Sequence, residues 1–107
     1  MLILKRYEYL KCFWKYIDDE TPVIMFYEVD LENERYATRM MEVFPNGKIS
    51  LGTNEGFGFV SEAPVPSVDE INKDDEFMAE EISKAEFEKM YALHRYPKKP
   101  EFSFEKE

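Results

Sequence analysis

ERYATRMMEVFPNGKISLGT, residues 34–53, contains two strand-like runs on either side of the turn sequence Pro45-Asn46-Gly47. An Asn-Gly pair between apolar runs is the strongest short-range signal for a β-hairpin, because both residues tolerate the positive φ of a tight turn. We therefore predict one strand over residues 35–44 and a second over residues 48–53.

Alternation assigns the side chains of this hairpin to two faces of a sheet. In the first strand Ala37, Met41 and Val43 fall on one face, and in the second strand Ile49 and Leu51 point inward. By the same count Arg35 and Arg39 share a face, because they are four residues apart.

Two further strands are expected before the hairpin. Residues 9–17 are rich in aromatic side chains, and alternation places Leu10, Cys12, Trp14 and Tyr16 on one face. Residues 23–29 are apolar at nearly every position, which is typical of a strand in the middle of a sheet.

The C-terminal third carries two capping boxes, in which a serine and a glutamate three residues later satisfy the first backbone N–H groups of a helix. Ser67 with Glu70 predicts a short helix that ends near residue 72, and Ser83 with Glu86 predicts a longer helix over residues 84–94. The apolar stripe of the longer helix consists of Phe87, Met90, Tyr91 and His94. Residues 74–82 fit either a helical turn or a short strand, and we favour a turn followed by a strand.

These elements predict an α+β fold, with an antiparallel sheet of four to five strands and one or two C-terminal helices packed on one face. The 107 residues are expected to form one domain, 1–107, with short extensions at residues 1–7 and 97–107.

Charge limits the partners that the chain can bind. The net charge is −9, and residues 18–44 and 61–96 each carry −6 of local charge. This balance disfavours binding to nucleic acid or to an anionic membrane surface and allows a basic protein partner. The single cysteine, Cys12, excludes an internal disulfide. A cytoplasmic location is therefore expected, and the short apolar run at the N-terminus has neither the length nor the cleavage site of a signal peptide.

Scattered residues carry a resemblance to a known family. They are the run Tyr9-Leu10-Lys11-Cys12-Phe13-Trp14, Pro22, Arg35-Tyr36, Arg39, Glu42-Val43-Phe44, Asn46-Gly47, Pro64-Val65-Pro66-Ser67, Glu70-Ile71-Asn72, Glu81-Ile82-Ser83 and Glu86-Phe87. Over about residues 8–92 the chain resembles a family of small bacterial proteins classed as a domain of unknown function. The resemblance implies one compact α+β domain and carries no catalytic residue.

No recognisable catalytic or metal motif is present. His94 is the only histidine and continues an apolar stripe, and Cys12 falls on an apolar strand face, so both are expected to be structural. One histidine and one cysteine do not make a zinc site, and Asp18-Asp19-Glu20 and Asp74-Asp75-Glu76 lack the spacing of a calcium loop. We expect no cofactor and no metal, and the lack of a catalytic set favours a non-catalytic function while an enzyme stays as an alternative.

Three functions follow as hypotheses. The first is a non-catalytic protein-binding domain, in one form an immunity protein against a basic toxin, that meets its partner through six acidic residues: Asp18, Asp19, Glu20, Asp30, Glu32 and Glu34. The alternative is a small-ligand-binding module or minor enzyme whose pocket contains Trp14, Tyr16, Arg35 and Arg39. A third is a structural domain that oligomerises through Phe57, Phe59 or the Phe102–Phe104 tail.

Overall fold

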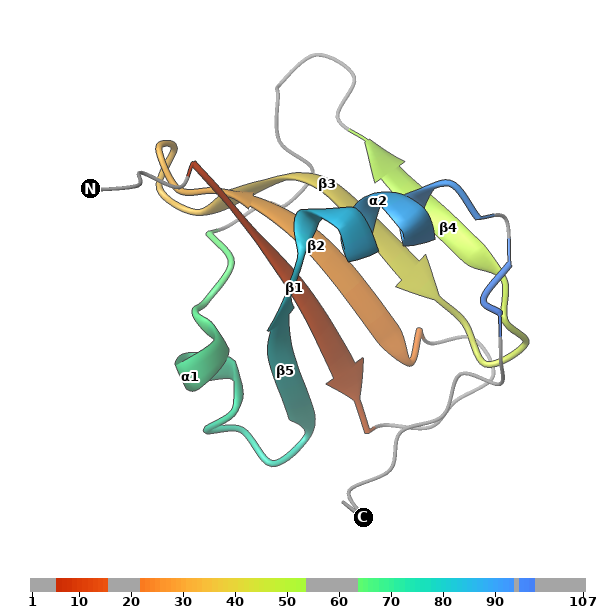
Figure 1. Cartoon of the computed structure of the whole chain (residues 1–107). Helices are drawn as coiled ribbons and strands as arrows, with labels where there is room; N and C mark the ends of the chain where they lie inside the picture. The colour runs from red at the N-terminus through yellow and green to blue at the C-terminus, as the bar shows by residue number, and fades with distance from the viewer. Residues whose placement is uncertain (1–5, 16–21, 54–63, 94, 98–107) are drawn as a thin grey trace.

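The computed structural model describes residues 6–15, 22–53, 64–93 and 95–97, which form one antiparallel sheet and two helices (Figure 1). The strands stand in the order β4-β3-β2-β1-β5. The elements are β1 (Tyr7–Trp14), β2 (Ile24–Asp30), β3 (Tyr36–Val43), β4 (Ile49–Thr53), α1 (Val68–Ile71), β5 (Phe77–Ile82) and α2 (Lys84–Tyr91). The predicted α+β class is confirmed, and residues 74–82 contain a turn followed by β5, as favoured.

The hairpin between β3 and β4 turns at the predicted Asn-Gly pair, although only Gly47, and not Asn46, has a positive φ. Gly47 has a φ of +90°, and its N–H donates to the Phe44 carbonyl at 2.8 Å. The C-terminal segment packs against this turn, because the Tyr96 N–H donates to the Gly47 carbonyl at 2.8 Å and Arg95 donates to the Asn46 carbonyl. Tyr96 is buried, so the last described residues close the core.

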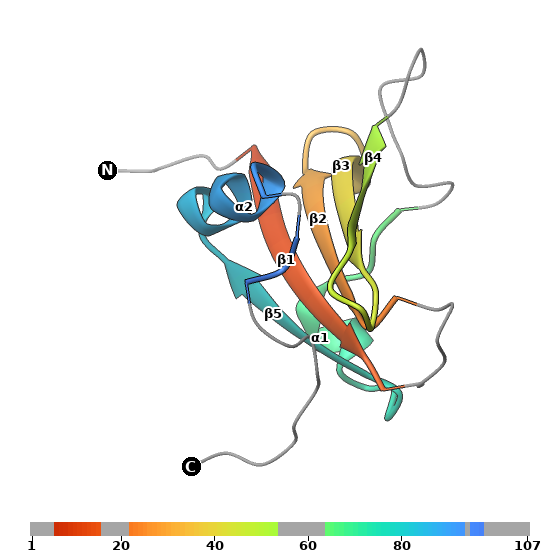
Figure 2. The same ribbon diagram turned by 90° about the vertical axis from the view of Figure 1, so that its right-hand side faces the viewer.

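The sheet has a separate apolar cluster on each face. α2 covers the first cluster, which centres on Phe26, Met41 and Phe87. α1 packs against the second, which contains Leu10 and Val29. Figure 2 shows α2 on one side of the strands and α1 behind them. The C-terminal helix therefore lies on one face, as predicted, and the short helix lies on the other.

A β-bulge in β3 reverses part of the predicted alternation. Glu28 pairs with Arg39 but the next residue, Val29, pairs with Ala37, so Thr38 is an extra residue in β3. An extra residue shifts every side chain beyond it to the opposite face. Ala37 consequently belongs to the α1 face while Met41 belongs to the α2 face, and the prediction that they share a face is wrong.

Two smaller predictions agree with the structure only in part. Leu51 lies opposite the buried Met41, on the inward face as predicted, but β4 is an edge strand and Leu51 remains 48 % exposed. α2 ends at Tyr91 with Ala92 as its C-cap, and His94 lies outside the described residues.

Candidate functional site

A cavity of about 570 Å³ opens on the α1 face of the sheet, within the usual size range of ligand pockets. Strand alternation builds its sheet side. Every second residue of β1 points to this face, which brings Cys12 and Trp14 beside Met25 and Tyr27 of β2 and Phe77 of β5. The predicted shared face of Leu10, Cys12 and Trp14 is therefore confirmed.

The sheet side of the cavity is aromatic and fixed in place. The rings of Trp14 and Phe77 stack, with centroids 5.6 Å apart. The Tyr27 hydroxyl donates to Sδ of Met25 at 3.5 Å, and burial raises the pKa of Tyr27 to about 12. Burial likewise raises the pKa of the Cys12 thiol to about 11, so Cys12 is a neutral wall residue and a poor nucleophile at neutral pH.

The opposite side of the cavity comes from residues 64–74. Pro64, Val65, Pro66 and Ile71 add apolar surface, and Glu70 and Asp74 add two carboxylates. Among the described residues that line the cavity, none is basic. A mostly apolar space whose charged lining residues are all acidic favours a ligand that combines an apolar body with a positive group.

Arg35 and Asn72 fix this second side to the sheet. Arg35 donates to the Val65 carbonyl at 2.7 Å, to the Pro66 carbonyl at 3.1 Å and to the Glu8 carboxylate at 2.8 Å. The Asn72 amide exchanges two hydrogen bonds with the backbone of Ala79, at 3.0 and 2.6 Å. The cavity is therefore bounded by segments whose polar groups are paired to the sheet.

Acidic residues concentrate in the same segment. Residues 64–82 contain seven acidic residues and one lysine, a net charge of −6 out of −9 for the chain. All seven acids are exposed: Asp69, Glu70, Asp74, Asp75, Glu76, Glu80 and Glu81. The cavity thus lies in the most acidic described part of the protein.

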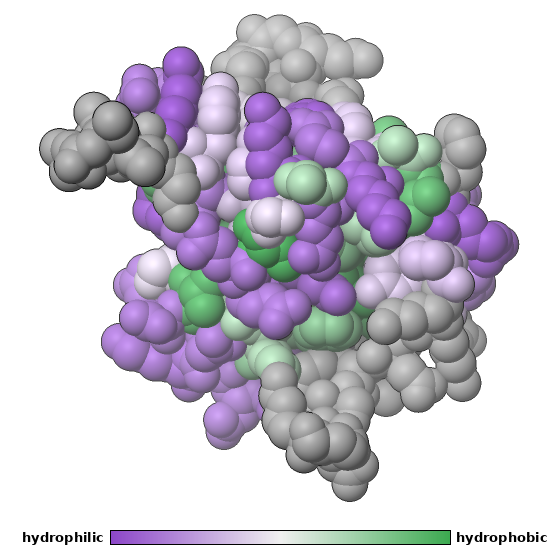
Figure 3. All heavy atoms as spheres, viewed as in Figure 1, coloured by the Kyte–Doolittle hydropathy of each residue, from purple (hydrophilic) through white to green (hydrophobic). Residues whose placement is uncertain are grey.

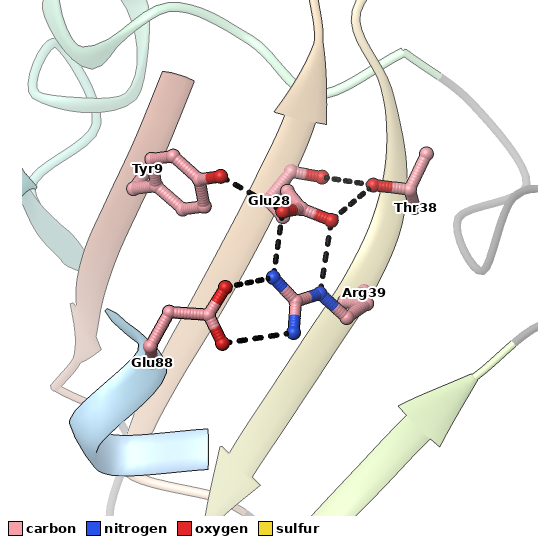
Figure 4. A network of polar contacts seen from close by, with 5 residues as sticks. All are labelled: Tyr9, Glu28, Thr38, Arg39 and Glu88. Carbon is pink, nitrogen blue, oxygen red and sulfur yellow. Dashed lines mark hydrogen bonds and ion pairs between the residues drawn. The ribbon is translucent and has the colours of Figure 1, made fainter. Parts of the chain in front are cut away.

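The α2 face carries a network of polar contacts centred on Arg39 (Figure 4). Its guanidinium contacts the carboxylates of Glu28 and Glu88, with a shortest distance of 2.7 Å to each. Glu28 also accepts hydrogen bonds from the Tyr9 hydroxyl at 2.9 Å and the Thr38 hydroxyl at 2.7 Å. The guanidinium carbon lies 5.0 Å from the ring centroid of Phe87, so the network joins β1, β2, β3 and α2.

The pKa shifts in this network all favour the ion pairs. Burial alone would raise the pKa of Glu28, but hydrogen bonds from Arg39, Thr38 and Tyr9 outweigh it and lower the pKa. The pKa of Glu88 is lowered chiefly by its hydrogen bonds from Arg39. Burial raises the pKa of Tyr9 to about 12, and the hydrogen bond to Glu28 adds to this shift. Arg39 is therefore engaged in holding α2 to the sheet.

A family model described as "Domain of unknown function (DUF6881)" matches residues 8–96. The chain belongs to this family. No curated protein and no solved structure gives a significant match. The match begins where the sequence resemblance begins and ends at Tyr96, the residue that closes the core beside the hairpin of this DUF6881 domain.

The structure separates the residues of the predicted ligand pocket. Trp14 lines the cavity, whereas Arg39 lies on the other face and Arg35 holds the 64–66 segment from outside the lining. The expectation that the two arginines share a face is wrong, because the bulge at Thr38 intervenes. Tyr16 lies outside the described residues.

The six acids of the predicted partner surface also differ in environment. Asp18, Asp19 and Glu20 lie outside the described residues, and Glu32 and Glu34 are exposed in the β2–β3 turn.

Asp30 is only 2 % exposed. Its carboxylate accepts hydrogen bonds from Arg6 and Asn33 and from the backbone of Glu32. Burial opposes ionisation of Asp30, but these donors outweigh it and lower the pKa. Asp30 therefore stabilises the turn.

The remaining predictions concern metal binding, membrane insertion and oligomerisation. In residues 6–15, 22–53, 64–93 and 95–97, no group of three or more metal-ligating side chains is close enough to hold an ion. Across the same residues, no helix has the length and hydropathy needed to cross a bilayer. Phe57, Phe59 and the Phe102–Phe104 tail lie outside the described residues.

Sequence reasoning identified Trp14 but missed the acidic side of the cavity. The signal was present in the run Asp74-Asp75-Glu76 and in the capping box at Ser67, but the first was judged only against calcium-loop spacing and the second only as the start of a helix. Only the pairing of β1 with β5 brings Asp74 and Glu70 near Trp14.

Proposed function

We propose that this DUF6881 protein is a non-catalytic binding domain whose α1 face docks onto a basic protein. The observation that carries the proposal is that residues 64–82, the segment with a net charge of −6, supply much of the lining of the apolar cavity. Interfaces commonly combine an apolar centre with a polar rim, and complementary charge accelerates association and selects the partner.

The α2 face is less suited to docking. It presents mostly hydrophilic residues, with hydrophobic ones visible only in small areas between them (Figure 3). Its partly buried arginine, Arg39, is already paired with Glu28 and Glu88. A protein that bound there would find fewer apolar contacts than at the cavity.

The narrower form of the proposal is an immunity protein that neutralises a basic nuclease toxin in the bacterial cytoplasm. Small size, strong acidity and an aromatic docking surface support it, because a tight inhibitor of a basic enzyme benefits from electrostatic steering. The identity of the retained partner distinguishes this form from other basic partners.

The test compares two triple variants of equal net charge. One carries Asp69→Asn, Asp75→Asn and Glu81→Gln on the α1 face, where Glu81 lies opposite Leu10, and the matched control carries Glu32→Gln, Glu34→Gln and Glu86→Gln elsewhere on the surface. Tagged proteins are incubated with lysate of the source organism and washed at low and then high salt. We expect the native protein and the control to retain the same basic protein, which leaves at high salt, and the α1-face variant to retain much less.

Two results would contradict the choice of the α1 face as the binding surface. One is equal retention by all three proteins, which would mean that overall charge and not the α1 face attracts the partner. The other is loss of retention in the control variant alone, which would indicate that the β2–β3 turn, with Glu32 and Glu34, is the binding surface. Retention of no basic protein would remove the function itself.

A further inference from the structure

We propose that the cavity on the α1 face receives the cationic side chain of an arginine or lysine from the partner. This inference rests on the proposed function and specifies how the partner is anchored. Arginine is enriched among the residues that dominate interface energies, and such residues usually fill a pocket at the centre of the contact.

The walls of the cavity suit the aliphatic stem of such a side chain. Trp14, Tyr27 and Phe77 provide aromatic surface from three strands, and Val65 and Ile71 provide aliphatic surface opposite them. Long basic side chains bury their methylene groups against apolar surface while the charged end stays near polar groups.

The two carboxylates of the lining suit the charge. Glu70 and Asp74 line it, and among the described lining residues no lysine or arginine offsets them. A cation over the face of a tryptophan or tyrosine gains a favourable electrostatic interaction, and a guanidinium binds a carboxylate with two parallel hydrogen bonds. An acidic or neutral side chain of the same length would gain neither.

The two carboxylates are held near the cavity before any partner arrives. Glu70 accepts hydrogen bonds from the Ser67 backbone and hydroxyl, both at 3.3 Å, within the capping box of α1. Asp74 accepts the Glu76 N–H at 2.9 Å in the turn before β5. Because these groups are already ordered, less conformational entropy is lost when a cation binds.

Trp14 provides the readout, since it is the only tryptophan of the chain and lines the cavity. Its fluorescence is titrated with N-acetyl-arginine amide, with N-acetyl-lysine amide and with N-acetyl-citrulline amide at constant ionic strength. Citrulline has nearly the shape of arginine without its charge. We expect saturable changes with the two cationic probes and binding of citrulline that is about tenfold weaker. Equal binding of citrulline, or no saturable change with either cation, would overturn the inference.

Variants then locate the binding. Glu70→Gln preserves the capping box, because glutamine also serves at that position, and Asp74→Asn keeps a side-chain oxygen for the turn. We expect the double variant to bind the two cationic probes about tenfold more weakly than the native protein. Its affinity for the citrulline probe should be unchanged. The matched control, Asp69→Asn with Asp75→Asn, removes two acids that do not line the cavity and should bind like the native protein. Thermal melting confirms that every variant is folded.

The partner-level experiment separates this inference from the proposed function. Excess N-acetyl-arginine amide should release the basic protein retained by the native domain, whereas citrulline amide at equal ionic strength should not. Release by neither probe, together with normal retention by the Glu70→Gln, Asp74→Asn variant, would overturn the inference and leave the α1 face as the docking surface. Absence of any retained basic protein would remove the proposed function, while the fluorescence titration would still decide the ligand chemistry of the cavity.

Discussion

Replacement of Arg39 by methionine should destabilise the protein by about 3–4 kcal/mol. The largest part comes from Glu28, whose side chain is 10 % exposed and would lose its only charged partner among the described residues. Removing one member of a buried ion pair costs roughly 3–5 kcal/mol. We take the low end because the Tyr9 and Thr38 hydroxyls still donate to Glu28.

The other contacts of Arg39 contribute less. The Glu88 side chain is 43 % exposed, and an exposed ion pair contributes about 0.5 kcal/mol. The cation–π contacts with Phe87 and Tyr91 are partly replaced, because methionine also packs well against aromatic rings. Urea denaturation at pH 7 followed by circular dichroism gives the free energy of unfolding of each variant.

A second variant and a change of pH test whether the unpaired charge of Glu28 causes the destabilisation. Adding Glu28→Gln to Arg39→Met removes the unpaired charge, so the double variant should recover about 2 kcal/mol. In the native protein the pKa of Glu28 is depressed below its ordinary value of 4.5, so its contribution is present above that pH and is lost as the pH falls through the depressed pKa.

In Arg39→Met the burial of the Glu28 carboxylate is no longer offset by the guanidinium. Protonation of Glu28 removes this unpaired charge, so the difference in free energy of unfolding between the variant and the native protein should become smaller toward pH 4. A cost below about 1 kcal/mol at pH 7, or a difference that does not change with pH, would refute the reasoning.

Three further outcomes follow from the fold. Asp30→Ala should lower the free energy of unfolding by about 3 kcal/mol, because the buried carboxylate accepts hydrogen bonds from several donors at the β2–β3 turn. Glu32→Ala should change it by no more than about 0.5 kcal/mol, and similar melting temperatures for the two variants would contradict this. Gly47→Ala should cost about 1–2 kcal/mol in denaturant titrations, since its φ of +90° disfavours a Cβ, and a stability equal to that of the native protein would refute the strain. Cys12 should react with iodoacetamide at pH 8 roughly a hundredfold more slowly in the folded protein than in urea, because burial raises its pKa from 9.0 to about 11; equal rates would show that the thiol is accessible.

The fold could be predicted wherever the signal is local. The Asn46-Gly47 pair closes its hairpin through its own backbone preferences, and the capping serines at residues 67 and 83 begin helices at the expected positions. The alternation of Leu10, Cys12 and Trp14 also holds, because β1 pairs with β2 and β5 without interruption.

The face of each residue in β3 could not be predicted in the same way. Whether Thr38 occupies a bulge depends on its pairing with Glu28 of β2, and nothing within residues 35–44 marks that position. The Thr38 hydroxyl lies within hydrogen-bond distance of both the backbone carbonyl and the carboxylate of Glu28, so the bulge is stabilised by a strand that the local pattern does not contain. Alternation applied across a bulge assigns every later residue to the wrong face.

The candidate site could be predicted only in part for a related reason. Trp14 was predicted from the aromatic face of residues 9–17, and Arg35 and Arg39 were predicted because their spacing of four residues places them on one face of a regular strand. The acids that do approach Trp14 follow it by more than fifty residues, and they reach it because β5 pairs with β1 at Phe77. Such a constellation depends on strand order, which spacing along the chain does not reveal.

The bulge also explains how one small sheet can serve two purposes. It directs Arg39 to the α2 face, where its ion pairs with Glu28 and Glu88 neutralise its charge and hold the helix. Arg35, before the bulge, remains on the α1 face but is bound to Glu8 and to two carbonyls at the back of the 64–66 segment. Neither arginine therefore neutralises the carboxylates at the cavity, and the negative potential there is preserved for a partner.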